Sequence, residues 1–572
     1  MKPGFQSNYY RFLRRRFFLF VILFSVIQIH GQDYSGYECP VNVNGKKLLN
    51  PFTGGFSAPQ FSTLDADQDG NEDLFVYDRV GNVPMLFLGN GDGGSDGYVF
   101  SRQLEDSWPV MCCWTLIRDF NRDGIGDIFT VPLSGGISGA ELHQGYLDQG
   151  VLKFKRRRMG GEPGDEEIIW FNLGFNTINV TIPFNDKPEI KDVDGDGDLD
   201  ILTFDLGGSF VNYYKNLQEE NGLPKDTMVY ELNDLCFGKF KESGFAETIF
   251  LSDDPDACAT EFHDPSDDIK SGGVHSGSTI LAYDNDNDND MDLLIGDLTN
   301  RGLVYLENGG SAQKAFMTSV DTLFPFYDSH VDMSIFLSAF EVDVDQDGLN
   351  DLLVSPNEIS SITNVNNIWY YRNTGNSNER FSLQQEDFLT EETLDFGSFS
   401  KPVFTDYNAD GLMDILVGTD GDFGTSGPAV LAMYLFENRG TAENPEFFLV
   451  DDDYLDFSQF SSTSRNPAPA FGDLDGDLDT DLVIGDAAGF LYYFENVAGP
   501  DAPYEFKAPV YKFMNIDAGQ TVSPAIADLN GDGLGDLIIG ERNSNLFNDT
   551  LGNVNYFENQ GSVGNPFFDS DV

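Results

Sequence analysis

Aspartate recurs at a fixed spacing in eight short stretches of this 572-residue chain. Each stretch fits the pattern D-x-[DN]-x-D-[GNL]-x-x-D-[LI]. In a tight turn, side-chain oxygens at positions 1, 3 and 5 converge on one centre, to which position 7 adds its backbone carbonyl and position 9 its carboxylate. A flexible set of about six hard oxygen ligands suits Ca²⁺ better than Mg²⁺ or a transition metal. The spacing therefore predicts eight calcium loops, with up to about eight Ca²⁺ ions as cofactor.

The predicted ligands stand at positions 1, 3, 5, 7 and 9 of the loops, which we number 1 to 8 along the chain. In loops 1 to 4 they are Asp65, Asp67, Asp69, Asn71, Asp73; Asp119, Asn121, Asp123, Ile125, Asp127; Asp192, Asp194, Asp196, Asp198, Asp200; and Asp284, Asp286, Asp288, Asp290, Asp292. In loops 5 to 8 they are Asp343, Asp345, Asp347, Leu349, Asp351; Asp406, Asn408, Asp410, Leu412, Asp414; Asp473, Asp475, Asp477, Asp479, Asp481; and Asp528, Asn530, Asp532, Leu534, Asp536. We expect Asp290 to offer its carbonyl only, with its side chain a bystander.

Position 6 of each loop needs a positive φ, and glycine meets that need without steric cost. Asn289 replaces glycine in loop 4, and Leu478 replaces it in loop 7. Asparagine tolerates the left-handed conformation, whereas leucine should strain the turn by roughly 1 kcal/mol. We expect loop 4 to bind Ca²⁺ normally and loop 7 to bind it worst.

Short apolar and aromatic segments surround every loop, such as "DLLIGD" after the aspartates and "GFLYYFENVAG" further on. They run for four to eight residues between Gly, Asn and Asp turns, which is typical of β-strands. An EF-hand would instead have a Glu at position 12 and flanking helices. Each unit of about 60 residues therefore reads as a small antiparallel sheet, and such sheets bury both faces when packed radially. We predict an all-β fold over residues 51–572: a β-propeller of about eight four-stranded antiparallel blades. Residues 45–52, at the end of an N-terminal segment (32–50), are predicted to complete the last blade and close the ring.

These units resemble FG-GAP (VCBS-type) repeats, the blades of the integrin α-subunit propeller and of many exported bacterial proteins. The stretches "FGDLDGDLDTDLVIGD" (471–486) and "SPAIADLNGDGLGDLIIGE" (523–541) carry the resemblance best, and it covers roughly residues 50–572. The resemblance implies a calcium-bound propeller with the loops on one rim. Because integrin propellers have seven blades, seven blades plus an extra repeat is the alternative. The "YFEN" segments further resemble proteins exported by gliding Bacteroidetes-type bacteria.

The N-terminus predicts export. Four arginines (Arg11, Arg14, Arg15, Arg16) precede an apolar run over residues 17–27 that is typical of a signal peptide, here residues 1–31. A short membrane anchor is the alternative interpretation. We expect a secreted or outer-surface protein without a membrane span in the mature chain.

The net charge of −62 argues against nucleic acid as a partner, since phosphate binding needs a basic surface.

Two enlarged units, with insertions near residues 129–190 and 215–278, are the expected places for specificity, because loops on a rigid scaffold commonly carry binding. Cys236 could pair with Cys258 inside the second insertion, and Cys39 could pair with Cys112 or Cys113. The basic run "KFKRRR" (153–158) is expected to neutralise acidic neighbours, the alternative being a site for an anionic glycan or partner.

No constellation of nucleophile, base or metal-bound water stands out in the sequence. We therefore predict a protein that is not an enzyme: a binding or adhesion module for a glycan or protein at the cell surface. The alternative is a secreted polysaccharide-degrading enzyme, a lyase or hydrolase, built on a calcium-bearing propeller.

Overall fold

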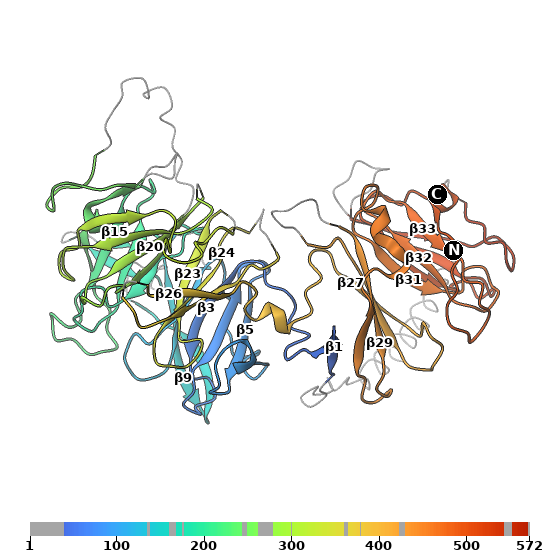
Figure 1. Cartoon of the computed structure of the whole chain (residues 1–572), viewed down its shortest axis with the longest axis horizontal. Coiled ribbons are helices and arrows are strands. Elements are labelled where there is room, and N and C mark those ends of the chain that lie inside the picture. Colours follow the sequence, from blue (N-terminus) through green and yellow to red (C-terminus); the bar gives the residue numbers. More distant parts are fainter. Residues whose placement is uncertain are drawn as a thin grey trace, which may run out of the picture.

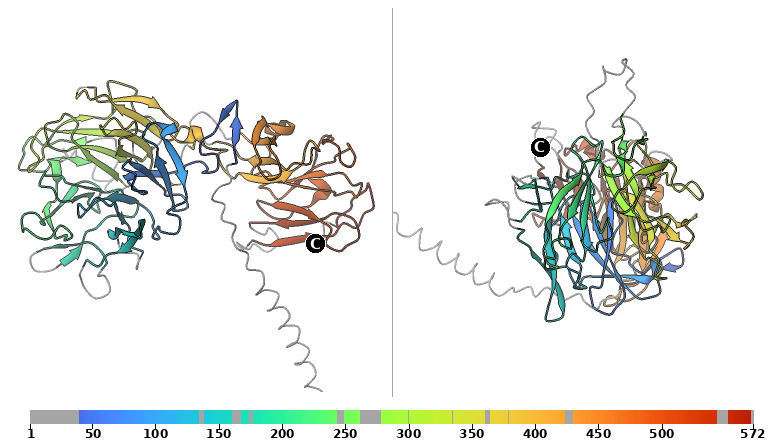
Figure 2. Two further views of the ribbon diagram at one scale, coloured as in Figure 1. Left: turned by 90° about the horizontal axis from the view of Figure 1, so that it is seen from below. Right: turned by 90° about the vertical axis from the view of Figure 1, so that its left-hand side faces the viewer.

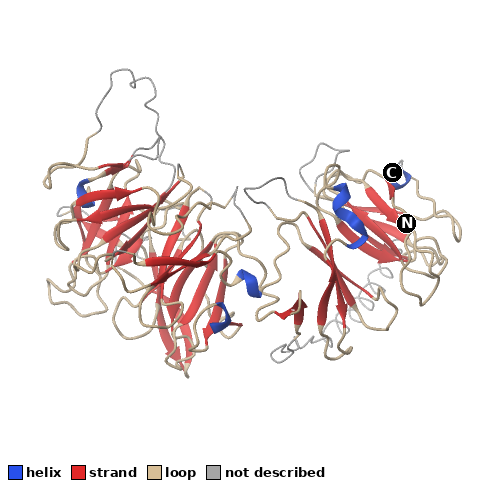
Figure 3. Cartoon of the chain, in the orientation of Figure 1, coloured by secondary structure: helices blue, strands red, loops and turns tan. Residues whose placement is uncertain are grey.

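The computed structural model describes residues 39–133, 138–159, 167–173, 177–242, 249–260, 278–298, 300–333, 335–359, 364–377, 379–422, 430–542 and 552–569. All eight aspartate-rich loops lie within these ranges, and the predicted signal peptide lies outside them. Among the described residues, none of the helices has the length and apolar character needed to cross a bilayer. Strands dominate, with only a few short helical turns between them (Figure 3).

Eight sheets follow one another along the chain, one for each repeat unit, and we number them 1 to 8. Sheet 1 contains β3 (Pro59–Leu64), β4 (Asp73–Asp78), β5 (Val83–Gly89) and β6 (Tyr98–Ser101). Sheet 2 contains β7 (Thr115–Arg118), β8 (Asp127–Thr130), β9 (Glu141–Asp148) and β10 (Val151–Arg156). Sheet 3 contains β13 (Glu189–Lys191), β14 (Asp200–Phe204), β15 (Val211–Asn216) and β16 (Tyr230–Asp234), extended by β11 (Trp170–Asn172) and β12 (Thr177–Asn179). Sheet 4 contains β19 (Ser278–Tyr283), β20 (Asp292–Asp297), β21 (Val304–Asn308) and β22 (Met317–Asp321).

The remaining sheets repeat this plan. Sheet 5 contains β23 (Leu337–Val342), β24 (Asp351–Pro356), β25 (Trp369–Asn373) and β26 (Phe381–Gln385). Sheet 6 contains β27 (Lys401–Thr405), β28 (Asp414–Thr419), β29 (Ala432–Asn438) and β30 (Phe447–Asp451), extended by β1 (Val41–Val43) and β2 (Lys46–Lys47). Sheet 7 contains β31 (Ala468–Gly472), β32 (Asp481–Gly485), β33 (Leu491–Phe494) and β34 (Val510–Tyr511); sheet 8 contains β35 (Ser523–Ala527), β36 (Asp536–Gly540) and β37 (Val554–Phe557). Outside the eight sheets are the pair β17 (Lys241–Glu242) and β18 (Ile249–Phe250), and the 3₁₀ turns η1 (Ser95–Gly97), η2 (Phe237–Lys239), η3 (Thr390–Glu392), η4 (Tyr454–Phe460) and η5 (Phe513–Asn515).

The first strands of sheets 1 to 5 contact one another in a closed cycle. β3 lies against β7 and β23, β19 lies against β23 and β13, and β13 lies against β7. Apolar clusters fill every junction of this cycle, including the one between sheets 5 and 1, where the Phe61 and Phe340 rings lie 5.5 Å apart. Second strands such as β4 and β20 are buried along their whole length, as expected for apolar runs covered on both faces.

Sheets 6 to 8 form a second, open series. β31 contacts both β27 and β35, and apolar clusters join sheet 6 to sheet 7 and sheet 7 to sheet 8. Figure 1 shows the two groups side by side, and the view from below keeps them apart (Figure 2). The arrangement differs from the predicted single ring of about eight units, and also from seven plus one, because sheet 5 packs back onto sheet 1 instead of onto sheet 6.

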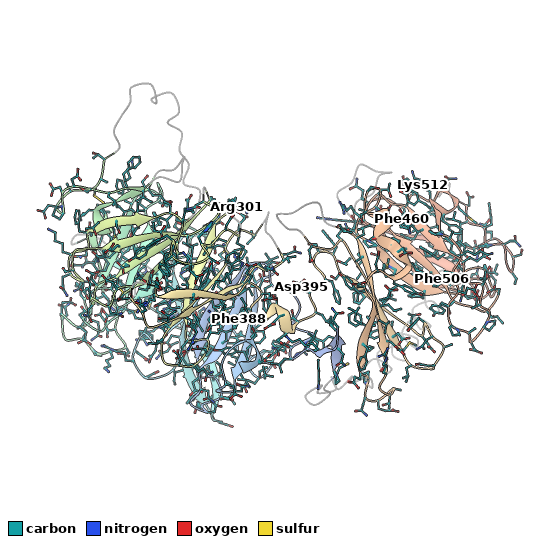
Figure 4. The ribbon with its side chains drawn as sticks, in the orientation of Figure 1. Arg301, Phe388, Asp395, Phe460, Phe506 and Lys512 are labelled. Atoms are coloured by element: carbon teal, nitrogen blue, oxygen red, sulfur yellow. A yellow bond between two sulfur atoms is a disulfide. The ribbon has the colours of Figure 1, made fainter. Side chains whose placement is uncertain are left out.

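The N-terminal hairpin does not complete the last sheet as predicted. β1 pairs in parallel with β30 of sheet 6, where Val41 and Leu48 pack on Phe436 and Phe447. The next residues reach the first group, since Asn50 donates to the carbonyl of Tyr98 at 2.9 Å. This segment lies between the two groups, close to the connection marked by Phe388 and Asp395 (Figure 4). It contacts both groups, through the pairing of β1 with β30 and through the bond from Asn50 to Tyr98, and sheet 8 keeps three strands among the described residues.

The insertions add local structure to sheet 3. Within residues 129–190, β11 and β12 widen the sheet, and within 215–278 the Cys236–Cys258 disulfide confirms the predicted pair. The predicted pairing of Cys39 with Cys112 or Cys113 is wrong, because all three are free thiols. Cys39 packs on sheet 6, whereas Cys112 and Cys113 pack between sheets 2 and 3.

Candidate metal-binding loops

Each aspartate-rich loop joins the first strand of its sheet to the second, and all eight share one hydrogen-bond frame. The carboxylate at position 1 accepts the N–H of position 6, and the carboxylate at position 5 accepts the N–H of position 7. In loop 8 both of these bonds measure 2.9 Å. Because aspartate side chains bond to the backbone just ahead of them, the frame follows from the sequence itself.

In loops 1, 3, 4 and 5 the carboxylates at positions 1 and 3 lie together with a third carboxylate. In loops 1 and 3 the third group is position 9, as in Asp65, Asp67 and Asp73, and in loops 4 and 5 it is position 5, as in Asp284, Asp286 and Asp288. The oxygens of each set lie within 4.8 Å of one another. Position 3 is asparagine in loops 2, 6 and 8, which therefore have one carboxylate fewer.

The backbone is left-handed at two positions of every loop. Position 6 has the predicted positive φ throughout, including 70° at Asn289 and 76° at Leu478. Position 4 also has a positive φ in all eight loops, which the sequence did not reveal because its residue types vary. They are Gln68, Arg122, Gly195, Asn287, Gln346, Ala409, Gly476 and Gly531.

The aspartate at position 9 is buried in all eight loops, with at most 1% of its surface exposed. One of its oxygens accepts the N–H of position 2, and the other accepts an N–H at the end of the third strand. For Asp481 these donors are Leu474 at 3.0 Å and Asn496 at 2.9 Å, and the Tyr493 hydroxyl adds a third bond at 3.1 Å. Position 9 thus fastens the loop to the sheet, and its Oδ1, which accepts only the bond from the third strand, keeps a lone pair for a cation.

Burial makes these position 9 carboxylates unfavourable as anions. Desolvation is the largest cause, and it raises the pKa to about 6 for Asp73, Asp351 and Asp414, about 7 for Asp127, Asp292 and Asp481, and about 8 for Asp200. A bound cation would relieve that penalty, since an opposite charge favours the ionised form.

Position 7 differs from expectation where it is aspartate. The side chains of Asp198, Asp290 and Asp479 are only 2–4% exposed, and the Oδ1 atom of each is buried without a hydrogen-bond partner. Asp290 is thus buried within its loop, and desolvation and the neighbouring Asp288 raise its pKa to about 7. Orphaned carboxylate oxygens of this kind fit a cation, because a buried acceptor without a partner is costly.

An asparagine at the end of the third strand is a structural residue that the ligand pattern missed. Its Oδ1 accepts backbone N–H groups of the following turn; in sheet 6, for example, Asn438 accepts from Gly440 at 3.0 Å and from Glu446 at 3.1 Å. The recurring "EN" of the aromatic segments is the signal that could have found it. The pair "EN" ends in Asn308, Asn438, Asn496 and Asn559, and the equivalent residues Asn216 and Asn373 follow Lys and Arg.

The basic run at 153–158 lies among acidic partners, as expected. Arg156 pairs with Glu141, and with Glu167 at 2.7 Å, while Lys153 pairs with Asp148 at 2.6 Å. These arginine and lysine side chains balance local charge on sheet 2.

Comparison with known proteins identifies one repeat type. Residues 343–417 match the family model described as an FG-GAP-like repeat. No curated protein is similar enough in sequence to match the chain.

Toxin-complex proteins are among the solved structures to which the chain is similar. They include a Photorhabdus luminescens Tc holotoxin pore carrying the TccC3-D651A mutation (14% identity, TM-score 0.18) and TcdB2-TccC3 without its hypervariable C-terminal region (11% identity, TM-score 0.15). The matches cover 87% and 90% of this chain but only 23% and 33% of those chains. Scores this low carry no argument about function.

Proposed function

Because the chain is an FG-GAP-type repeat protein, we propose that its eight loops bind Ca²⁺ and that the ions stabilise an exported binding module. The observation that carries this proposal is the loop frame, which in loops 1, 3, 4 and 5 brings the oxygens of three loop carboxylates within 4.8 Å of one another. Carboxylate and carbonyl oxygens in a flexible loop are the donor set of Ca²⁺. Positions 1, 3, 5 and 9 would hold the ion through side chains and position 7 through its carbonyl.

The ions have a structural role in this proposal. Position 9 fastens each loop to the second and third strands, so that a cation held by the same carboxylate links the loop to the sheet core. The bound charge also offsets the repulsion among the loop aspartates, which contribute to the net charge of −62. Extracellular calcium modules bind with dissociation constants on the order of 10⁻⁴–10⁻³ M, so the loops would fill after export.

Sheets 1 to 5, in this proposal, form a five-bladed propeller, and sheets 6 to 8 form an attached arc of three blades. The cycle of contacts between the first strands supports the first part. Since every loop joins a first strand to a second strand, loops 1 to 5 would share one rim. The opposite rim and the insertions would then be the surfaces that bind a glycan or protein partner.

A pocket of about 210 Å³ supports ligand binding at the second insertion. Tyr213, Phe237, Lys239, Gln313 and Lys314 contribute to its lining, beside the Cys236–Cys258 disulfide. The Tyr213 and Phe237 rings lie 5.6 Å apart, and amides and paired charges surround them. Aromatic rings combined with a few placed polar groups suit a small polar ligand such as a sugar unit.

A calcium titration tests the metal assignment. The melting temperature of the exported chain should rise from excess chelator to millimolar Ca²⁺, and titration calorimetry should detect several bound ions. An unchanged melting temperature together with no heat of binding would overturn the proposal. Magnesium at the same concentration is the control, because its strict octahedral preference fits these loops poorly.

A further inference from the structure

One position on the third strand varies in charge from sheet to sheet. It immediately precedes the residue whose N–H bonds to the position 9 aspartate. In sheets 1 to 8 it is Leu88, Gln144, Lys215, Glu307, Arg372, Glu437, Glu495 and Glu558. Sheets 4, 6, 7 and 8 thus have glutamate there, whereas sheets 3 and 5 have a basic residue.

Lys215 places its ammonium group among the ligands of loop 3. Its Nζ pairs with Asp194 at position 3, lies 3.3 Å from Asp196 at position 5, and pairs with Glu220 from the following turn. The side chain is only 18% exposed, and that of Asp194 is 5% exposed. Solvent therefore screens this cluster weakly.

Arg372 makes the same contacts in loop 5. Its Nε lies 2.5 Å from Asp345 at position 3, and its terminal nitrogen lies 2.9 Å from Asp347 at position 5. The arginine side chain is 49% exposed, so it is held less tightly than Lys215. Two sheets that are distant in sequence thus direct a cation at the same two ligand positions.

Glutamate at this position has the opposite effect on the charge of the loop. In sheet 8 the Glu558 carboxylate accepts a bond from the amide of Asn530, the position 3 residue of loop 8, at 3.2 Å. Glu558 therefore brings a negative charge to position 3 of loop 8, the place at which Lys215 and Arg372 bring a positive one in loops 3 and 5. In sheets 6 and 7, Glu437 and Glu495 pair instead with Arg439 at 2.6 Å and with Lys507 at 2.5 Å.

We propose that Lys215 and Arg372 are tethered cations that compete with Ca²⁺ for loops 3 and 5, which therefore bind the ion more weakly than loop 4, where position 3 is also aspartate and the third strand carries Glu307. The inference rests on the proposed calcium binding. An entering ion must displace the basic group from positions 3 and 5 or bind beside a like charge, and both outcomes reduce affinity. An affinity difference of roughly tenfold is expected for one displaced ion pair in a partly buried cluster. Loop 3 should be the weaker of the two, since Lys215 is the more buried group. Without metal, the basic side chains would then hold the aspartates of these two loops together.

The test counts tightly bound Ca²⁺ by native mass spectrometry and calorimetry on the full chain at a calcium concentration that fills only the strong sites. Lys215→Gln should add one tight site, and Arg372→Gln should add one with a smaller gain in affinity. Lys153→Gln is the matched control, because Lys153 pairs with Asp148 at 2.6 Å outside the loops; the ion count should not change. Asp192→Asn then assigns the site: it should remove a tight ion from the Lys215→Gln protein and none from the parent.

The reverse substitution keeps the inference testable if Lys215→Gln fails to fold. Glu307→Lys in sheet 4 should remove one tight ion from loop 4 while the other ions stay bound. An unchanged ion count in both Lys215→Gln and Glu307→Lys would overturn the inference while leaving calcium binding intact. The absence of any bound ion in the parent protein would instead overturn the proposed function.

Discussion

Sheets 1 to 5 and sheets 6 to 8 are built from the same repeat, yet the first group closes on itself and the second does not. In the first group charged residues of the first strands meet across the sheets: Lys191 of sheet 3 pairs with Glu341 of sheet 5 at 2.5 Å. Arg118 of sheet 2 likewise pairs with the buried Glu189 of sheet 3 at 2.9 Å.

The second group ends in open sheet faces. Phe404 on β27 is 62% exposed and Val554 on β37 is 74% exposed. The comparison teaches that the repeat determines the single sheet, whereas closure depends on whether distant sheets can cover each other's apolar faces.

Calcium removal should have the largest effect, and it should separate the two groups. Millimolar Ca²⁺ is about one to ten times the expected dissociation constants, so each ion stabilises the folded state by about 0.4–1.4 kcal/mol, and several loops add up. In chelator, scanning calorimetry should show a large fall in melting temperature, with sheets 6 to 8 unfolding first because their end faces are uncovered. Limited proteolysis should then release fragments from the part after residue 400. Cleavage within sheets 1 to 5 before any cleavage in sheets 6 to 8 would contradict this order.

Phe61→Ala removes a ring that packs between sheets 1 and 5, where the cycle of sheets closes. The ring is 2% exposed and packs on Phe340, and removing a buried phenylalanine costs about 3–5 kcal/mol. The transition of the first group should move to lower denaturant concentration, while that of sheets 6 to 8 stays in place. Phe513→Ala, at the junction of sheets 7 and 8, is the matched control and should do the reverse. If both substitutions shift both transitions equally, the two groups form one cooperative unit.

The pH dependence of the metal-free protein should be steeper in the first group. The folded-state pKa values of Asp127, at about 7, and Asp200, at about 8, lie above the ordinary aspartate value of 3.8. A carboxyl with a raised folded-state pKa favours the folded state only while it stays protonated there, so in chelator the free energy of unfolding should fall as pH rises from about 4 to 8. The slope is up to about 1.4 kcal/mol per pH unit for each such group.

Two observations check this dependence. In urea titrations with chelator, the free energy of unfolding of sheets 1 to 5 should fall more from pH 5 to pH 8 than that of sheets 6 to 8. In sheets 6 to 8 the raised pKa values are about 6 for Asp414 and about 7 for Asp481. Saturating Ca²⁺ should remove most of the difference, because it pairs with the ionised carboxylates. Greater stability at pH 8 than at pH 5 without calcium would show that these carboxyls do not govern the fold.

The sequence predicted much of what lies within one repeat, although not the positive φ at position 4 or the role of the third-strand asparagine, and it failed on what joins repeats. The loop frame and the positive φ at Leu478 depend on residues at most nine positions apart, so the pattern contains them. The disulfide between Cys236 and Cys258 joins residues 22 apart within one insertion. By contrast, the contact of Phe61 with Phe340 and the pairing of β1 with β30 connect distant sheets with interchangeable apolar surfaces. Nothing in the local pattern distinguishes one such partner from another.

Loop 7 of the open group allows the smallest but cleanest change. Leu478 stands at position 6 with φ at 76° and is 75% exposed, so its side chain gains little from packing. Leu478→Gly should stabilise sheets 6 to 8 by roughly 1 kcal/mol, because it relieves a left-handed residue. It should also tighten calcium binding by loop 7, since the turn is part of the site. The matched change Gly411→Leu in loop 6 should cost a similar amount, given that Gly411 has φ at 88° and open space around it. Equal melting temperatures for Leu478→Gly and the parent, at saturating and at limiting Ca²⁺, would mean that the strain is absorbed elsewhere in the loop.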